Sequence, residues 1–320
     1  MERIELASDF LGNPATRYFS NGFKKISFTL CSEKWNDQRE IEGVIDIYCL
    51  ESVKRNTLDK DKHHLGTIEY LALSCCLVED IIRCSLGLSE NQISRSWINK
   101  VSMKVKEPIA FETQAQARTI VRVNTTKPCE NSINGFQSEV LVKINETMVK
   151  MIVDHPLGSC TQIHPFINIE EVDTNRLYSE GYKLRTHQIS QIVYSTNDNI
   201  CSAEVFIQNE FKGDRGIGSF YKSTLLTDII AVTGQMVQIL LYSIENKKRE
   251  ECNNLWLREL EIAYPIPNGQ LSYQNNIRFT DYRQLYKGDE KWSCITVENT
   301  ISDDKCKSYF KIAHKTKIDG

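Results

Sequence analysis

Hydrophobic and polar positions along this 320-residue chain change their spacing twice, in the same order. Alternating or continuous apolar positions at 25–30 and 42–48 predict two strands. Residues 65–86 then place apolar side chains three and four positions apart, which predicts a helix with a broad apolar arc. Further strand-like segments follow at 97–105, 117–123, 137–143 and 148–153. The first half therefore predicts two strands, one long helix and a run of antiparallel strands.

The second half repeats this order. Strands are predicted near 187–194 and 202–208, and a helix runs from about 223 to 242. The strands that close the second half are expected near 256–264, 271–279, 291–298 and 306–313. Both predicted helices are apolar over most of their surface, as expected for helices that a sheet largely encloses.

Short motifs recur at one fixed shift. Residues 17–24 (RYFSNGFK) match residues 176–183 (RLYSEGYK) at a shift of 159, and Trp97 falls on Trp256 and His155 on His314 at the same shift. Tryptophan and histidine are rare here, with four and six copies, so chance is a poor explanation. We expect one domain at 1–156, a linker at 157–170 and a second copy at 171–320.

This order of elements predicts an α+β fold of the tandem (double) hotdog type. Each copy would be an antiparallel sheet wrapped around one long central helix. Two copies in one chain would pair as a dimer does, so the expected state is a monomer that is a pseudo-dimer, with a homodimer as the alternative.

Composition excludes several classes of protein. Hydrophobic residues make up 41% and charged residues 25%, which is typical of a globular chain. A net charge of -3 gives no excess of cations for phosphates, so no nucleic-acid partner is expected. Without an apolar run for a signal or a span, we expect a cytoplasmic protein with no membrane partner. Of the eleven cysteines, only Cys160 has a nearby histidine, His164, so no metal site is expected.

Charged residues within an enclosed helix are the first candidates for chemistry. Glu69 falls on Asp228 at the shift of 159, so both predicted helices carry a carboxylate in their first turns. Helix N-terminal amides can bind an oxyanion, and burial would raise the carboxylate pKa into the range of a general base. The alternative is that both acids only complement the helix dipole.

Other polar positions near these helices have competing interpretations. His63 and His64 precede the first helix and could shuttle protons, although exposed loop histidines are the alternative. Glu79 corresponds to Gln238, and a satisfied polar contact between the two helices explains that pair. Trp97 and Trp256 are interpreted as core anchors.

The repeated motif supplies candidate substrate-binding residues. Arg17 and Lys24, with Arg176 and Lys183 in the second copy, could bind an anionic or phosphorylated group. Tyr182 and the other aromatic residues of the motif would line or pack the same region, and His63 is a further candidate for substrate binding. A repeated fold also repeats purely structural residues, so a structural role stays open for all of them.

Residues 9–12 (DFLG) and 17–23 resemble the opening of the AvrD family, and residues 178–183 and 254–258 (NLWLR) are similar to later AvrD segments. This resemblance covers nearly the whole chain. It implies a role in making syringolides, acylated sugar-derived signals that plants perceive. The implied reaction joins a β-ketoacyl unit, carried as a thioester, to a pentulose-like sugar or its phosphate.

More distantly, the layout resembles the A-factor synthase (AfsA) group, whose tandem hotdog domains transfer a β-ketoacyl chain to dihydroxyacetone phosphate. A His-rich lead-in and a helix carboxylate, here His63–His64 with Glu69, are similar. An Arg-Gln pair that follows the carboxylate in that group is absent, because residues 72–73 and 231–232 are apolar. Arg17 or Arg176 would have to replace that arginine.

The leading hypothesis is an acyl-transferring or condensing enzyme of secondary metabolism, with Glu69, Asp228 and His64 as catalytic candidates. Its substrate would be an acyl thioester of coenzyme A or of acyl carrier protein, and no further cofactor is expected. Two alternatives remain: a hotdog thioesterase or dehydratase, and an acyl-ligand-binding module without chemistry.

Overall fold

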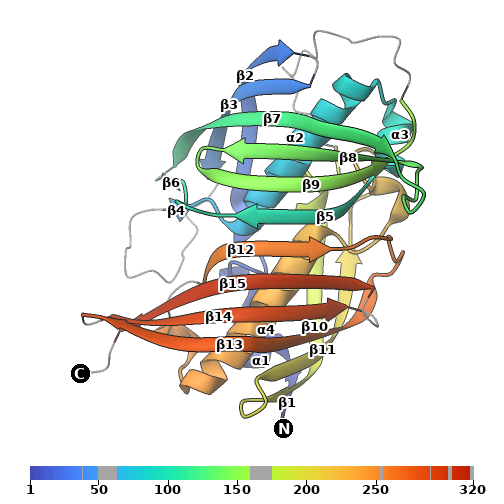
Figure 1. Cartoon of the computed structure of the whole chain (residues 1–320). Coiled ribbons are helices and arrows are strands. Elements are labelled where there is room, and N and C mark those ends of the chain that lie inside the picture. Colours follow the sequence, from blue (N-terminus) through green and yellow to red (C-terminus); the bar gives the residue numbers. More distant parts are fainter. Residues whose placement is uncertain are drawn as a thin grey trace.

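The computed structural model describes residues 1–37, 39–49, 63–111, 113–158, 175–252, 255–288, 290–301 and 305–317. Within these residues the chain forms one antiparallel sheet of 13 strands and two long helices (Figure 1). From edge to edge the strands are β1 (Glu2–Leu6), β10 (Arg185–Ser195), β11 (Ile200–Asn209), β13 (Ser272–Lys287), β14 (Glu290–Ile301), β15 (Cys306–Lys317), β12 (Leu255–Ala263), β5 (Trp97–Lys104), β9 (Thr147–His155), β8 (Phe136–Ile144), β7 (Gln114–Pro128), β3 (Glu40–Cys49) and β2 (Ile26–Asp37).

The helices are α1 (Ala7–Leu11), α2 (Thr67–Leu86), α3 (Glu90–Arg95) and α4 (Leu226–Glu245), and a two-stranded sheet pairs β4 (His63–His64) with β6 (Ala110–Phe111). Short 3-10 turns complete the described elements: η1 (Pro14–Thr16), η2 (Gly22–Lys25), η3 (Gly181–Leu184), η4 (Ser219–Tyr221) and η5 (Arg249–Glu251). The α+β class is confirmed, and every strand and long helix expected above is present. Most ends are shifted by a few residues, but β2 and β13 extend seven and eight residues beyond their expected ends at 30 and 279.

Both long helices lie against the sheet and are buried on almost every side. Figure 1 shows α2 behind the strands of the upper part and α4 behind those of the lower part. α2 contacts β7 and β8, α4 contacts β10, β11 and β13, and the two helices contact each other. Each helix ends at a residue with left-handed backbone, Gly87 (φ 62°) and Asn246 (φ 50°), which stops the helical hydrogen bonding. Their burial explains why apolar positions are not confined to one narrow stripe.

α4 alone among the described helices is long and apolar enough to cross a membrane by length and composition. In the fold, 83% of its apolar window is buried. The sheet and α2 therefore already cover the surface that a lipid environment would otherwise have to cover.

The two long helices follow the spacing of the sequence motifs. α2 and α4 each have 20 residues, and their first and last residues are separated by the same 159 positions that relate the sequence motifs. Phe23 and its counterpart Tyr182 stack on each other, with ring centroids 6.0 Å apart and an interplanar angle of 19°. Residues at matching positions of the two halves therefore contact each other in the core.

The two halves share a continuous sheet, because β12 pairs with β5 over five residues, from Glu259 opposite Lys104 to Ala263 opposite Lys100. One feature was not expected from sequence: β1 pairs with β10, so the N-terminal strand extends the sheet of the second half. The proposed boundaries at 156 and 171 stay predictions, and the linker at 157–170 lies, after Gly158, outside the described residues.

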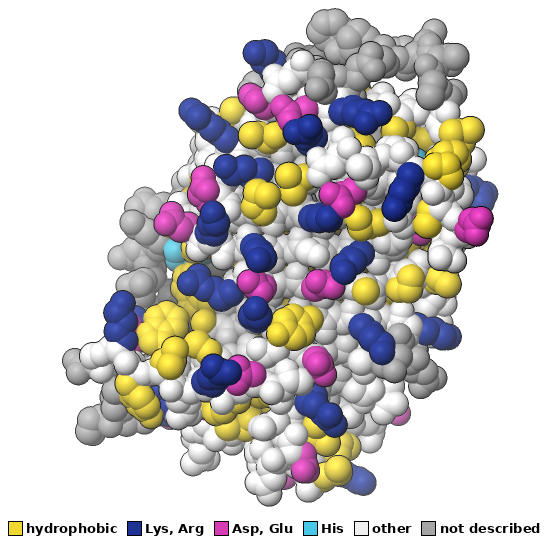
Figure 2. Space-filling view, in the orientation of Figure 1, with side chains coloured by type: hydrophobic (Ala, Val, Ile, Leu, Met, Phe, Trp, Pro, Cys, Tyr) yellow, Lys and Arg dark blue, Asp and Glu magenta, His cyan; other side chains and the backbone are white. Residues whose placement is uncertain are grey.

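The outer face of the sheet carries charges of both signs (Figure 2). Ion pairs join strands across it: Lys100 lies 2.7 Å from Glu261, and Lys311 lies 2.7 Å from Glu259. These side chains alternate with core residues such as Leu260 and Ile262, which face the helices. The alternation accounts for the period-two pattern of the strand-like segments.

Candidate active site

A partly open apolar cavity lies where the N-terminus of α2 meets the middle of α4 and the strands β12 and β15. Its volume is about 110 Å³. Its lining residues are Tyr18, Phe19, His64, Leu65, Gly66, Thr67, Tyr70, Val105, Pro108, Ile230, Thr233, Gly234, Gln238, Leu255, Trp256, Leu257, Phe310 and Ile312. Because aromatic and aliphatic side chains predominate, the cavity suits an apolar ligand with one or two polar groups.

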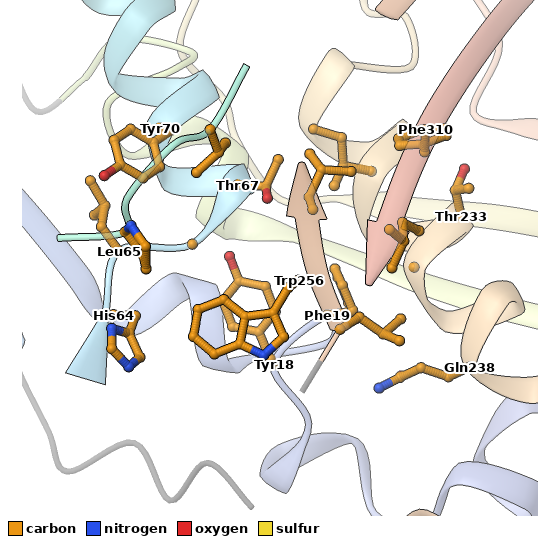
Figure 3. Close-up of a pocket in the computed structure, with 18 residues that line it drawn as sticks. Tyr18, Phe19, His64, Leu65, Thr67, Tyr70, Thr233, Gln238, Trp256 and Phe310 are labelled. Carbon is orange, nitrogen blue, oxygen red and sulfur yellow. The ribbon is translucent and has the colours of Figure 1, made fainter. Parts of the chain in front are cut away.

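His64 is separated from Thr233 and Gln238 along this cavity (Figure 3). In Figure 3, His64 lies at one side of the view, Thr233 and Gln238 lie at the other, and Trp256 and Phe19 lie between them. Both halves of the chain contribute, since His64 precedes α2 whereas Thr233 and Gln238 belong to α4. Neither half could form this cavity alone.

Glu69 lies beside the cavity in the first turn of α2 and is 0% exposed. The hydroxyl of Tyr18 donates a short hydrogen bond to Oε2 of Glu69, and Tyr18 itself lines the cavity. Glycine is required at the N-cap position Gly66, because a Cβ there would lie 1.9 Å from Tyr18 Oη and 2.6 Å from Glu69 Oε2. The phenol and the carboxylate therefore pack directly against Gly66.

The two histidines that precede α2 lie on the short strand β4, where His63 pairs with Phe111 and His64 with Ala110. His64 lines the cavity, and its ring meets the ring of Trp256 edge-on at 5.4 Å. The structure thus brings His64, Tyr18 and Glu69 to the same end of α2. The position of the His63 side chain is outside the described part of the structure.

Asp228, the counterpart of Glu69, lies in a different environment. It is 1% exposed, with Oδ2 2.9 Å from Arg185 Nη2 and Oδ1 2.8 Å from His187 Nε2, and its Oδ2 also accepts a 2.7 Å hydrogen bond from the Leu225 amide. Burial alone would raise the pKa of Asp228, but the ion pair with Arg185 and the bonds from His187 and Leu225 outweigh it and lower that pKa. The expectation that burial raises the pKa of this carboxylate is therefore wrong for Asp228.

Two substitutions within the repeat explain the difference. At the shift of 159, Arg185 and His187 occupy the positions of Ile26 and Phe28 in the first half. The second half thus places a cation and an imidazole where the first half has apolar side chains. Asp228 serves as a helix cap and ion-pair partner, while Glu69 contacts a phenol that lines the cavity.

The cations of the repeated motif do not converge on this cavity: none of Arg17, Lys24, Arg176 and Lys183 is among its lining residues. Lys183 Nζ instead bonds Glu180 at 2.7 Å. Burial lowers the pKa of Lys24, with Asp228 and Glu210 acting in the opposite direction. Tyr182 is buried in the stack with Phe23.

Each motif arginine reaches the long helix of the other half. Arg17 Nη1 donates to Gln235 Oε1 on α4 at 3.0 Å, whereas Arg176 Nη1 lies 2.7 Å from Asp80 and 3.2 Å from Glu79 on α2. The motif therefore joins the halves reciprocally, which gives its recurrence a structural reason. Whether these residues also bind substrate stays a prediction.

Glu79 has the satisfied environment that was expected, but its partners differ from the expected ones. Oε1 accepts from Arg83 at 2.7 Å, and Oε2 accepts from the Ile217 amide at 3.0 Å. Burial raises the pKa of Glu79, with Arg176 the largest opposing influence. Its counterpart Gln238 bonds Tyr242 and lines the cavity instead of meeting Glu79.

Tyr18, Gln238 and Trp256 line the cavity although no sequence pattern assigned them to it. Trp97 is a core anchor as predicted, buried with Nε1 donating to the Tyr264 carbonyl at 2.6 Å. Trp256, at the same position of the repeat, lines the cavity. Nothing in the local sequence separates the two tryptophans, because the difference depends on which strands lie opposite them.

No group of three or more potential metal ligands occurs among the described residues.

The fold and the site together define an α+β protein with an apolar ligand cavity between two similar halves. A family model described as Pseudomonas avirulence D protein (AvrD) matches residues 4–303. The chain therefore belongs to the AvrD family, as its motifs indicated. No curated protein matches the chain.

Solved structures with a similar arrangement share little sequence with this chain. A pyran synthase domain from module nine of the sorangicin pathway is 11% identical, with a TM-score of 0.44, and covers 91% of this chain and 98% of that domain. A thioesterase described as putative from Novosphingobium aromaticivorans is 8% identical, with a TM-score of 0.36, and covers 91% of this chain and 99% of its own. A hot dog fold protein of unknown function from Alicyclobacillus acidocaldarius is 5% identical, with a TM-score of 0.38 and coverages of 95% and 99%. At these TM-scores the likenesses carry no argument about activity.

Proposed function

We propose that this AvrD-family protein is a tandem hotdog enzyme that transfers an acyl group from a thioester to a sugar or sugar-phosphate hydroxyl. The observation that supports the proposal most directly is the apolar cavity lined by Tyr18 and His64 beside the N-terminus of α2, with Glu69 hydrogen-bonded to Tyr18. The shared 159-residue spacing of α2 and α4 supports two hotdog copies. The family membership supports a role in syringolide-like signal synthesis.

In this proposal the acyl chain occupies the apolar part of the cavity, between Trp256, Phe310 and Ile312. The thioester carbonyl faces the amides at the start of α2, whose partial positive charge stabilises a developing oxyanion. The apolar lining excludes water from this position, which strengthens the interaction. The carrier, coenzyme A or acyl carrier protein, stays outside the cavity.

Proton transfer follows from the order of groups at the α2 end. Glu69 is buried behind Tyr18, so the acceptor hydroxyl gives its proton to Tyr18 Oη as Tyr18 passes its own to Glu69. The acceptor oxygen then forms the ester bond, the carbon–sulfur bond breaks, and the thiolate takes the proton that Glu69 received, returned through Tyr18 Oη, so that both side chains regain their starting state. Asp228 has no part in this scheme, because Arg185 and His187 already occupy its oxygens.

The test is mass spectrometry of the purified protein with a β-ketoacyl thioester, with and without a glycerone- or xylulose-type phosphate. Glu69→Gln and Tyr18→Phe are compared with Glu107→Gln, a change at an exposed glutamate. An acyl–sugar product that requires the acceptor, Glu69 and Tyr18 but not Glu107 supports the transferase.

Two other outcomes replace the transferase with the alternatives. Free acid formed without an acceptor indicates a thioesterase that uses the same carboxylate on water. Thioester that binds but never turns over, with equal affinity in Glu69→Gln, indicates a binding module. Absence of thioester binding overturns the assignment of the cavity.

A further inference from the structure

Arg17 is a buried cation without a counter-ion among the described residues. It is 4% exposed, and its side chain makes one hydrogen bond, from Nη1 to the neutral amide oxygen of Gln235 at 3.0 Å. Its Nε is buried without a hydrogen-bond partner. Its charged neighbour is a second cation, Arg249; burial and this neighbour lower the pKa of Arg17 to about 10. A buried guanidinium group with a second cation beside it is unfavourable unless an anion binds next to it.

The other half of the molecule shows what compensates the same residue. Arg176, at the position of Arg17 in the repeat, lies 2.7 Å from Asp80 and 3.2 Å from Glu79. On α4 the positions of these two acids are taken by Gln238 and Ile239. The fold therefore accommodates carboxylates beside Arg176, whereas the matching positions of α4 offer none to Arg17.

Arg249 brings a second guanidinium group into the neighbourhood of Arg17. It is half-buried on η5, and its Nη2 donates to the Thr16 carbonyl at 3.1 Å, next to Arg17 in the chain. No ion pair involves Arg249 within the described part of the chain. Ser20 Oγ, which donates to the same Gln235 oxygen at 3.1 Å, adds a hydroxyl to the cluster.

We propose that Arg17 and Arg249 form a binding site for a phosphate group, free or as a phosphate monoester. Two guanidinium groups bind the oxygens of one phosphate with charge-assisted hydrogen bonds, and arginine suits this geometry better than lysine. Of the four motif cations predicted to bind an anion, only Arg17 belongs to this phosphate site. Its second cation is Arg249, which the motif does not contain. Arg176 and Lys183 already have carboxylate partners.

The site lies beside the acyl cavity. Phe19, two residues after Arg17, lines the cavity, and the cavity-lining Gly234 directly precedes Gln235 on α4. The phosphate of a phosphorylated acceptor bound here would hold its hydroxyl group near the cavity. That last step depends on the proposed function, whereas binding of phosphate does not.

The experiment measures thermal unfolding of the full chain with inorganic phosphate, against chloride at the same ionic strength. A phosphate-dependent rise in Tm is expected for the wild type, because a ligand that binds only the folded state stabilises it. Arg249→Ala, a change at a half-buried residue, should weaken phosphate binding about tenfold or more, as expected for loss of a charge-assisted contact. Arg278→Ala, on the exposed side of β13, is the control and should leave binding unchanged.

Gln235→Glu is the decisive variant, because it places a carboxylate at the atom that now accepts from Arg17. It should raise Tm without phosphate and abolish the response to phosphate. No phosphate response in the wild type, an equal response in every variant, or a lower Tm for Gln235→Glu would each overturn the proposal. Binding of the acyl thioester, measured in parallel by fluorescence, reports on the proposed function separately.

Discussion

Replacing Asp228 by asparagine separates a structural carboxylate from a catalytic one. Asp228 is 1% exposed and holds Arg185 at 2.9 Å, His187 at 2.8 Å and the Leu225 amide at 2.7 Å. Asparagine keeps the shape of the side chain but leaves Arg185, itself buried, without its counter-ion. We expect Asp228→Asn to destabilise the fold without removing a proton acceptor from the reaction.

The magnitude follows from the burial of both partners. Removing one member of a buried ion pair costs about 3–5 kcal/mol, because the remaining charge stays desolvated. For a chain of this size that corresponds to a fall in Tm on the order of 10 °C. Urea unfolding followed by circular dichroism should show an earlier midpoint with an unchanged slope.

The pH dependence gives a second, independent measurement. Because the pKa of Asp228 is lower in the folded than in the unfolded chain, its stabilisation is present above the unfolded value of about 3.9. It is lost as the pH falls through the folded pKa. The wild type should therefore lose stability on acidification below about pH 4, and Asp228→Asn should lack this component.

Glu69→Gln is the matched comparison at the equivalent position of the repeat. It should abolish acyl transfer, whereas Asp228→Asn should retain turnover at a temperature where it is folded. If Asp228→Asn is as stable as the wild type and loses turnover, the assignment of Asp228 as a structural residue is refuted.

Three further predictions follow. Gly66→Ala should lower turnover about tenfold or more with the fold intact, because the new Cβ displaces Tyr18 Oη and Glu69 Oε2; kinetics and circular dichroism on the same sample check this. Gly234→Ala should weaken acyl-thioester binding, since its Cβ would lie 2.6 Å from the Phe19 ring, and titration calorimetry measures the loss. Arg176→Met should cost about 3–5 kcal/mol in urea unfolding, because Asp80 loses its ion-pair partner and Glu79 keeps only Arg83; a cost below about 1 kcal/mol would contradict the buried-pair interpretation.

Periodicity and self-comparison predicted most of the fold. The two long helices are apolar because the sheet covers them, and the strands alternate because their outer face is solvated, so both signals follow from burial. The pairing of β1 with β10 left no such signal, because five residues are too few to establish a period and the partner is distant in the chain. Ion pairs such as Arg176 with Asp80 were hidden for the same reason.

The candidate site was predictable only in part. Glu69 and His64 stand out because a charged or titratable residue beside an apolar helix is unusual. Tyr18 does not, since its role depends on the loop folding back over Gly66. The contrast between Glu69 and Asp228 depends on Arg185 and His187, which lie about 40 positions before Asp228 in the chain and reach it only in the folded sheet.

The stacking of Phe23 on Tyr182 has an evolutionary consequence. In a symmetric homodimer one gene encodes both partners, so every mutation appears twice and the two helix ends must stay identical. In the tandem arrangement proposed above, the two copies occupy one chain, and a mutation in one leaves the other unchanged. Selection could therefore place Asp228 with Arg185 and His187 in the second copy alone. In the same way, acids could contact Arg176 while the amide of Gln235 contacts Arg17. Fusion of the copies thus permits a division of labour that a dimer of identical subunits excludes.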